Sequence, residues 1–473
     1  GVSQLNAGSG SDTLQGANLD SSWSLNGGNG SVASAGNALD FTGFEIIEAG
    51  SGIDTVTVLS GTSWLLGGGA GNASNNGITF TGIESAQSSA TRLNGSSDDD
   101  SFRVTSPGTV IGNNIAFNST SAVGLTVIDG GDGDDTVTAN GSTDVTLTGA
   151  DYSAITSGIT FSSIEIVSAG ANLVGSSNAD TFMVVDSNAL IANKINFSSI
   201  SSVDAGAGND SVNGHSGSTW SLAGGSGNAS NSGVFFSNIE TATGTDANLY
   251  GSASNDRFVV TATGVVTGND IAFTSTAIGG VSRIDGGSGV DSVSGINGVN
   301  WLLSGTDNGL IHSNVNFSDI EQVSVSNAIS KATSDNEDII INGDQEIYVA
   351  GISFAGLDGV DAGAGTDSVF VENTNSVSLT GINHQVSSSG LLFTEVDVVN
   401  GGQVEGTLGV DTWLLTGSAS ELITAGINFK GISQVNGNGG IDTLTASAGN
   451  DQFEILSSGS LLTAGVEFSD VSS

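Results

Sequence analysis

The residues of this sequence that could do chemistry are aspartates in a recurring glycine-rich turn. The turn reads Gly-x-Gly-x-Asp and runs into an alternating segment, as in GGDGDDTVT from Gly130 and GGSGVDSVS from Gly286. Glycine permits a left-handed backbone, and carboxylate and carbonyl oxygens are the ligands that calcium prefers. The turns therefore predict cation sites. The candidate metal ligands are Asp54, Asp129, Asp132, Asp134, Asp135, Asp210, Asp291, Asp367, Asp442 and Asp451.

The same aspartates have a second interpretation, in which each side chain only holds its own turn by accepting backbone N–H bonds. Asp129, Asp132 and Asp134 lie close to Asp135 in the sequence, and a bare cluster of carboxylates would repel itself. That crowding favours a cation at the Gly130 copy. Both interpretations stay open for the other copies.

The turns resemble the Gly-Gly-x-Gly-x-Asp-x-apolar-x nonapeptides of the repeats-in-toxin family. Further copies begin at Ala7, Ala49, Ala205, Ala362 and Gly437. The resemblance implies calcium bound between successive coils, and an exported bacterial protein similar to giant adhesin-type surface proteins. It covers about a fifth of the chain, because the good copies are separated by 42 to 81 residues and only Asp442 and Asp451 form a tandem.

Phenylalanines at nearly equal intervals of 36 to 44 residues indicate the structural elements that position these turns. An aliphatic residue lies two positions before each, and in ten of twelve repeats an apolar residue lies three positions after. Such a fixed period predicts one supersecondary unit stacked on itself. The twelve residues are Phe41, Phe80, Phe117, Phe161, Phe197, Phe236, Phe273, Phe317, Phe354, Phe393, Phe429 and Phe468.

The repeats are themselves duplicated. The segment from Trp64 returns from Trp220, 156 residues later, which indicates duplicated blocks of approximately 1–167, 168–323 and 324–473. No linker of distinct composition separates the blocks. We therefore expect one continuous array over residues 1–473.

Short alternating runs rich in Val, Ile and Thr, punctuated by Gly, Asn, Asp and Ser, predict an all-β chain. The predicted fold is an elongated parallel β-solenoid, β-helix-like or β-roll-like, of about twelve ~39-residue units. Each unit would form two rungs, or alternatively one large coil. Tandem Ig-like sandwiches are the alternative fold.

An aromatic residue often precedes the repeat phenylalanine by 15 or 16 positions, as at Trp64, Phe102 and Phe453. Exposed, these rings would be a platform for sugars; buried, they would be a core ladder. Valine replaces the ring at Val145 and Val377, which a core tolerates and a sugar platform does not. We therefore expect core residues. The three histidines, His215, His312 and His384, lie far apart and are expected in solvated loops.

The composition excludes several functions. The formal charge is −42, with 7 basic residues against 49 acidic ones, so the chain has no basic face for nucleic acid. No apolar run is long enough for membrane insertion. No Cys is present, so a disulfide framework is absent.

These features predict a structural protein that is not an enzyme, since every conspicuous acid belongs to the repeat. We expect an extracellular rod or fibre segment at a bacterial surface, such as an adhesin stalk, matrix filament or surface layer, stabilised by Ca²⁺. Its expected partners are further copies stacked end to end, a continuation of a longer chain, or cell-surface glycans. The alternatives are a carbohydrate-active β-helix enzyme and a carbohydrate-binding rod.

Overall fold

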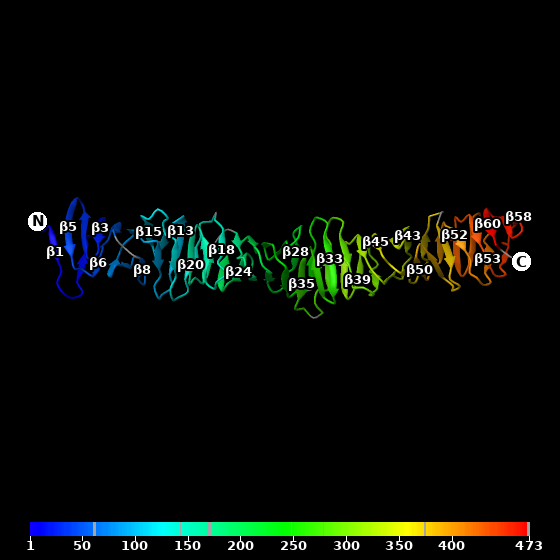
Figure 1. The fold of residues 1–473 in the computed structure, drawn as a ribbon, viewed down its shortest axis with the longest axis horizontal. Coiled ribbons are helices and arrows are strands. Elements are labelled where there is room, and N and C mark those ends of the chain that lie inside the picture. Colours follow the sequence, from blue (N-terminus) through cyan, green and yellow to red (C-terminus); the bar gives the residue numbers. More distant parts are fainter. Residues whose placement is uncertain are drawn as a thin grey trace. The chain divides into compact units, whose positions relative to one another are not determined.

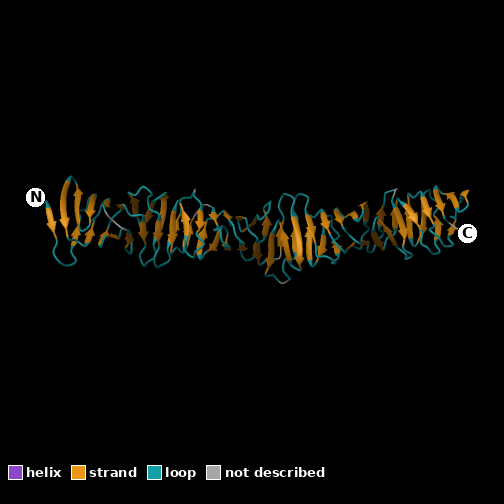
Figure 2. Cartoon of the chain, in the orientation of Figure 1, coloured by secondary structure: helices purple, strands orange, loops and turns teal. Residues whose placement is uncertain are grey.

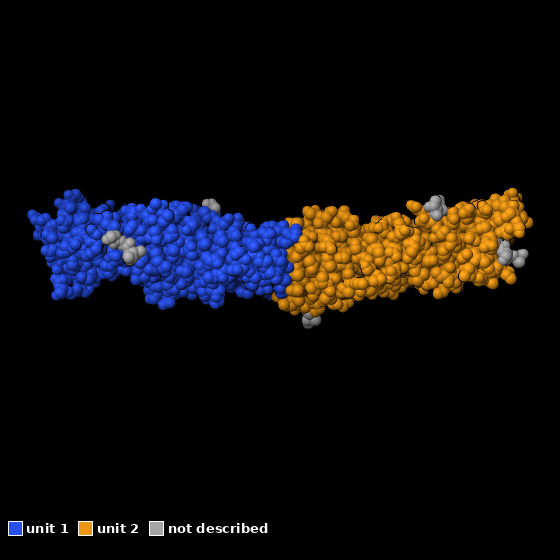
Figure 3. All heavy atoms as spheres, in the orientation of Figure 1, with its two compact units in different colours: residues 1–218, 226–243 blue, residues 219–225, 244–473 orange. Residues whose placement is uncertain are grey.

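The computed structural model describes residues 1–59, 63–141, 143–168, 170, 172–246, 248–277, 279–372 and 375–470. Its regular elements are all strands, β1 to β60, and no described residue is helical (Figure 2). The chain divides into two compact units, Gly1–Ser218 with Ser226–Thr243, and Thr219–Gly225 with Gly244–Ser473 (Figure 3). Each unit is a β-solenoid in which strands stack side by side (Figure 1). The predicted fold class is confirmed.

Each phenylalanine repeat contains five strands that are divided between two facing sheets, A and B. In one repeat, β11 (Ser85–Ser88) joins sheet A and β12 (Arg92–Asn94) joins sheet B. The next three strands, β13 (Ser101–Ser106), β14 (Thr109–Gly112) and β15 (Ile115–Ser119), form an antiparallel meander in sheet A. The following repeat exchanges the two sheets, so its meander, β18 to β20, lies in sheet B.

The meander runs backwards along the stack. Its last strand, β15, pairs in parallel with the earlier single strand β11, with Phe117 opposite Ala86. Its first strand, β13, pairs in parallel with the later strand β17, with Phe102 opposite Val137. About 31 residues separate paired positions of successive turns. The sheets are therefore continuous ladders rather than separate sandwiches, and neither two rungs nor one large coil per repeat describes them.

In unit 1, the strands of each sheet follow one another in space in the orders given next. Sheet A contains β1 (Gln4–Asn6), β5 (Asn37–Thr42), β4 (Asn29–Ser34), β3 (Ser21–Asn26), β7 (Asp54–Val58), β11, β15, β14, β13, β17 (Thr136–Thr138), β21 (Ile166–Ser168), β25 (Ile195–Ser198), β24 (Ala189–Ala192), β23 (Thr181–Asp186), β27 (Ser211–Asn213) and β31 (Thr241–Gly244). Sheet B contains β2 (Thr13–Gln15), β6 (Ile46–Glu48), β10 (Ile78–Thr81), β9 (Ala73–Asn75), β8 (Trp64–Leu66), β12, β16 (Val127–Asp129), β20 (Ile159–Ser162), β19 (Ala154–Thr156), β18 (Val145–Leu147), β22 (Leu173–Val174), β26 (Ser202–Asp204), β30 (Val234–Ser237) and β29 (Ala229–Asn231).

Unit 2 repeats this arrangement. Sheet A contains β35 (Ile271–Ser275), β34 (Val265–Gly268), β33 (Arg257–Ala262), β37 (Ser292–Ser294), β41 (Gln322–Ser324), β45 (Ile352–Ala355), β44 (Glu346–Val349), β43 (Asp338–Gly343), β47 (Ser368–Phe370), β51 (Val398–Asn400), β55 (Ile427–Lys430), β54 (Glu421–Thr424), β53 (Thr412–Leu415) and β57 (Thr443–Thr445). Sheet B contains β28 (Trp220–Leu222), β32 (Asn248–Tyr250), β36 (Arg283–Asp285), β40 (Val315–Ser318), β39 (Leu310–His312), β38 (Trp301–Leu303), β42 (Ile329–Lys331), β46 (Gly359–Asp361), β50 (Leu391–Thr394), β49 (Gln385–Ser388), β48 (Ser376–Leu379), β52 (Gln403–Glu405), β56 (Gln434–Asn436), β60 (Val466–Ser469), β59 (Ser460–Thr463) and β58 (Phe453–Ser457).

The repeat phenylalanines form the core between the two sheets. All twelve are at most 3% exposed, which confirms that they point inward. The ring of Trp64, in sheet B, lies 5.9 Å from that of Phe80 and 5.7 Å from that of Phe117 in sheet A. Aromatic contacts of this kind join the sheets. Val471, three positions after Phe468, lies outside the described residues.

The second aromatic position is also a core position, as the sequence predicts. Trp64, Phe102, Trp301 and their equivalents are buried, whereas Phe453 in β58 is 50% exposed. The sugar-platform interpretation is therefore wrong for the buried rings.

The neighbouring residues Phe235 and Phe236 provide a matched test of the core, because Phe236 is fully buried and Phe235 is 39% exposed. We expect Phe236→Ala to reduce the free energy of unfolding by about 3–5 kcal/mol, since it leaves a cavity between the sheets. Urea unfolding followed by circular dichroism measures the effect. Phe235→Ala should change it by less than about 1 kcal/mol, and equal losses for the two variants would contradict the core assignment.

Candidate functional site: buried carboxylates at the turns

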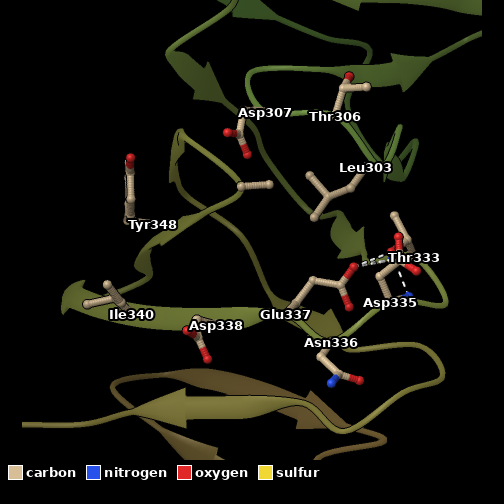
Figure 4. Close-up of a pocket in the computed structure, with 12 residues that line it drawn as sticks. Leu303, Thr306, Asp307, Thr333, Asp335, Asn336, Glu337, Asp338, Ile340 and Tyr348 are labelled. Carbon is tan, nitrogen blue, oxygen red and sulfur yellow. Dashed lines mark hydrogen bonds between the residues drawn. The ribbon is translucent and has the colours of Figure 1, made fainter.

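Six of the turns are held by an acidic side chain that accepts hydrogen bonds from a residue four positions earlier. At Asp100, the backbone N–H of Ser96 donates to Oδ2 at 2.5 Å, and the Ser96 hydroxyl donates to Oδ1 at 3.3 Å. Figure 4 shows the Glu337 copy, in which the Thr333 N–H and hydroxyl donate to Oε1. The same arrangement recurs at Asp180, Asp256, Asp411 and Asp451. These acids stabilise the turn that directs the chain into the next strand.

A second hydrogen bond connects acids on successive turns. The Asp100 N–H donates to Asp135 Oδ1 at 2.7 Å, and the Asp135 N–H donates to Glu165 Oε2 at 2.8 Å. Within this chain of three acids, each carboxylate after the first thus accepts the N–H of the acid before it. Equivalent chains of three acids are Asp180–Asp210–Glu240, Asp256–Asp291–Glu321 and Glu337–Asp367–Asp397, with the shorter links Asp54–Glu84 and Asp411–Asp442.

The middle acids of these chains are buried carboxyls. Asp54, Asp135, Asp210, Asp291 and Asp367 have no exposed surface. Each of them keeps an Oδ2 atom that is buried and has no hydrogen-bond partner, as does Asp442, which is 8% exposed. An unpartnered buried oxygen carrying negative charge is costly, so these positions favour a compensating proton or cation.

The pKa values follow from this environment. Burial raises the pKa of Asp135 to about 7, and the carboxylates of Asp100 and Glu165 act in the same direction. Burial likewise raises the pKa of Asp291 to about 6 and that of Asp367 to about 6. For Asp54 and Asp210 the pKa is also raised, again chiefly by burial. The folded chain therefore holds protons on some of these acids at mildly acidic pH.

The remaining predicted ligands lie elsewhere on the turns. Asp129 forms a 2.7 Å ion pair with Arg92. Asp132 and Asp134 are exposed, and the Asp134 N–H donates to Asp99 Oδ1 at 2.9 Å. Asp451 accepts hydrogen bonds from Ser447, as described above. The structure therefore links Asp135 to Asp100 and Glu165 by hydrogen bonds, while Asp129 forms an ion pair with Arg92.

The described residues supply two of the oxygen types that a calcium site uses. At Asp135 the free Oδ2 lies beside Gly130, where an added Cβ would overlap both this atom and the Ser163 carbonyl oxygen. A carboxylate oxygen and a backbone carbonyl are suitable ligands, but calcium takes six to eight oxygens. No group of three or more acids or histidines with metal-holding geometry occurs in the part of the chain that the structure describes. Calcium at these turns stays a prediction.

Sequence reasoning missed the acids that accept the last backbone N–H of these chains. They lie four positions after the repeat phenylalanine, at Glu45, Glu84, Glu165, Glu240, Glu321 and Asp397. That fixed offset was a detectable signal. It is concentrated in every second repeat, and therefore also marks the exchange of the meander between sheets.

The expectation that His312 lies in a solvated loop is wrong. His312 is fully buried in β39 and stacks on Trp301 with ring centroids 4.0 Å apart. The Ile296 N–H donates to Nε2 at 2.9 Å, and burial lowers the pKa of the ring, so the imidazole is neutral. Its position, five before Phe317, is polar and buried in other sheet-B meanders too, as at Asn75 and Asn231. His312 is thus a core residue of the repeat.

Comparison with known proteins adds no family. No family model matches the sequence, and no curated protein matches it significantly. The repeats-in-toxin resemblance therefore rests on the turn motifs alone. No helix long and apolar enough to cross a membrane is found among the described residues.

We expect the stability of the protein to fall as the pH rises from 5 to 8. In the folded state Asp135 has a pKa near 7, against 3.8 ordinarily, so its contribution is present at low pH and is lost as the pH rises through about 7. Asp135→Asn should make this fall smaller, because the amide is uncharged and Oδ1 can still accept the Asp100 N–H. Thermal melts across the pH range measure it.

The matched control is Asp132→Asn, which removes an exposed carboxylate from the same turn. That variant should keep the wild-type dependence of melting temperature on pH. Parallel curves for wild type and Asp135→Asn would show that Asp135 is not the titrating group.

Proposed function

We propose that this chain is a structural repeat protein, a segment of an extracellular rod or fibre such as an adhesin stalk, a matrix filament or a surface layer. One observation carries the proposal: the acids that could have formed an active site have one of two roles, and each role recurs along the stack. Asp135 and its equivalents accept an N–H from the preceding turn and donate their own N–H to an acid on the following one. Acidic residues that repeat the same hydrogen bonds along the stack favour a structural role for the chain.

The charge distribution supports the same proposal. The basic residues are 7 in number, and Arg92, Lys194 and Lys331 are each engaged by a neighbouring aspartate. Such a surface repels nucleic acid and anionic membranes, and limits side-by-side contact between copies. It suits a spacer that stays separate from its neighbours.

Export and calcium belong to the proposal through the resemblance of the turns to the repeats-in-toxin nonapeptide. Above its pKa of about 7, Asp135 is charged, and the N–H donors compensate only part of that charge. Bound calcium would compensate the rest. A cation bound only by the folded state would add to its stability by mass action.

Deletion of residues 168–323 tests the structural function, because it joins Val167 to Ser324 in strands that occupy equivalent places, β21 and β41. The deletion removes an even number of repeats, so the exchange of meanders between the sheets is preserved. We expect a folded, smaller protein with unchanged β-sheet signal per residue. Circular dichroism and small-angle X-ray scattering measure both properties.

The matched control deletes residues 168–203, a single repeat, and joins Val167 to Asp204. This places two meanders in succession on the same sheet, so we expect loss of cooperative folding. Failure of the 168–323 deletion to fold would contradict a stack of repeats whose number can change without loss of the fold.

Calcium is tested by chelation of the full chain. We expect the melting temperature to rise on addition of millimolar CaCl₂ after treatment with chelator, by several degrees, as a stability gain of about 1–3 kcal/mol implies. MgCl₂ at equal ionic strength is the control for screening. Equal melting temperatures in both salts would remove calcium from the proposal and leave the structural role intact.

A further inference from the structure

One place in unit 2 departs from the pattern that the other repeats share. A hollow of about 360 Å³ opens between the turn that joins β38 to β39 and the turn that leads into β43 (Figure 4). Its lining includes Leu303, Asp307, Glu337, Ile340 and Tyr348. A hollow of this volume lies in the range that small ligands occupy in proteins. The described stack has four other places of the same topology, at β8, β18, β28 and β48, so each residue can be compared with its equivalents.

Beside the hollow, two aromatic rings and an isoleucine are exposed on the outer face of sheet A. Ile340 pairs directly with Tyr348 on one side and with Phe370 on the other. Their exposed fractions are 40%, 41% and 38%. At the equivalent positions, the four other meanders have no aromatic residue. They carry Arg103, Ile111 and Thr138; Met183, Ile191 and Asn213; Val259, Thr267 and Ser294; and Leu414, Ile423 and Thr445.

Three exposed acids of the lining are also peculiar to this place. Asp307 lies in the turn after β38, Asp335 lies in the turn before β43, and Asp338 is the first residue of β43. Each of the four other places has at most one acid at these positions. Their residues are Ala70, Asp98 and Ser101; Asp151, Asn178 and Thr181; Ser226, Ser254 and Arg257; and Asn383, Gly409 and Thr412. The three acids are therefore not part of the repeated hydrogen bonds that hold the turns.

The chain itself leaves the charge of the hollow uncompensated. Among the described residues, no Lys or Arg belongs to the lining, and Lys331 is engaged by Asp361 at 3.1 Å. In Figure 4, Asp307 and Glu337 lie on opposite sides of the hollow, and Tyr348 and Ile340 line a third side. Carboxylates gathered around one small space repel each other and any anionic ligand, so the hollow favours a cation.

The mixed lining distinguishes between kinds of ligand. A bare metal ion gains nothing from Leu303, Ile340 and Tyr348, and the described residues contain no group of three acids or histidines with metal-holding geometry. A neutral sugar could stack on Tyr348, but it would leave the carboxylates uncompensated. An ammonium group on an aliphatic chain suits both parts of the lining. Its charge is attracted by the acids and by the face of the aromatic ring, and its methylene groups pack on the apolar side chains.

We propose that this hollow binds a small organic cation, an ammonium group carried on an aliphatic chain as in diamines and polyamines. Its walls are held by the chain's own hydrogen bonds. The Asn308 N–H donates to the Ala350 carbonyl oxygen at 2.9 Å, and the Thr333 N–H donates to Glu337 Oε1 at 3.1 Å. The inference goes beyond the structural function and does not depend on it: a stack of repeats carries one ligand site where the repeat pattern is broken.

Isothermal titration calorimetry of the full chain with spermidine tests the site. We expect one saturable site per chain, which MgCl₂ at equal ionic strength does not reproduce. Tyr348→Ala should weaken spermidine binding by at least about fivefold, because the ring is lost while the charge is unchanged. The matched control is Ile423→Ala, at the equivalent position and 36% exposed, which should leave the affinity unchanged.

A second pair of variants tests the acids at equal net charge. Asp307→Asn combined with Asp338→Asn should weaken spermidine binding by at least about tenfold, since two carboxylates no longer attract the ammonium groups. Asp98→Asn combined with Asp132→Asn removes the same charge from exposed turns of unit 1 and should change the affinity by less than twofold. Circular dichroism checks that all variants keep the wild-type fold.

Three results would overturn the inference. Equal losses of affinity in the two double variants would show that spermidine is only a diffuse counterion of an acidic chain. Binding of a neutral sugar such as cellobiose, without binding of spermidine, would assign the hollow to carbohydrate. Tighter binding of a lysine-rich peptide than of spermidine would assign it to a protein partner. The proposed structural function is tested separately, by the 168–323 deletion, and none of these results bears on it.

Discussion

Burial of one phenylalanine per repeat between two sheets is the interaction on which the remaining structure depends. Each ring packs beside an aliphatic residue of the preceding turn, as Phe161 does beside Ile128, and rings such as Trp64 connect the sheets. Because these contacts fix the spacing of the turns, the acid at each turn falls at the same height in every repeat. The hydrogen-bonded chains of carboxyls are thus a consequence of the core period.

The chains resolve an electrostatic problem that the composition creates. Like-charged groups such as Asp100, Asp135 and Glu165 lie close together, which is unfavourable in a medium of low polarity. Backbone N–H groups compensate part of the charge, and the raised pKa of Asp135 indicates that a proton compensates more of it at acidic pH. The unpartnered Oδ2 atoms mark where the compensation is incomplete. Stability and pH are therefore linked at the turns rather than in the core.

The sequence was sufficient to predict the β-solenoid and its core, because the phenylalanine period and the aliphatic residue two positions before it are direct signs of stacking. It was insufficient for the meander, since short strands such as β13, β14 and β15 look alike whether their neighbours are parallel or antiparallel. The alternation between sheets did leave traces, in the acid four positions after the ring and the polar residue five before it. His312 was predicted wrongly because its residue type differs from that of Asn75 and Asn231, which occupy the same position of the repeat and are also buried.

The turn aspartates illustrate the limit for chemistry. The motif located Asp135 and its equivalents correctly on tight turns, but a turn that binds calcium and a turn that accepts N–H groups need the same residues. What separates them is the second partner, Glu165 in this case, which comes from a turn 30 residues away. Local sequence patterns carry no information about that partner until the register of the stack is known.

Because the meander runs backwards along the stack, it affects how the chain folds when its N-terminal residues emerge first. In each repeat the last meander strand pairs with a strand that already exists, such as β15 with β11, while the first strand waits for a later one, as β13 waits for β17. Every folded repeat therefore presents strands with which the next repeat can pair. At each stage one strand edge in each sheet is still unpaired. Vectorial synthesis or secretion can then complete the protein by successive local steps, without waiting for distant parts of the polypeptide to find each other.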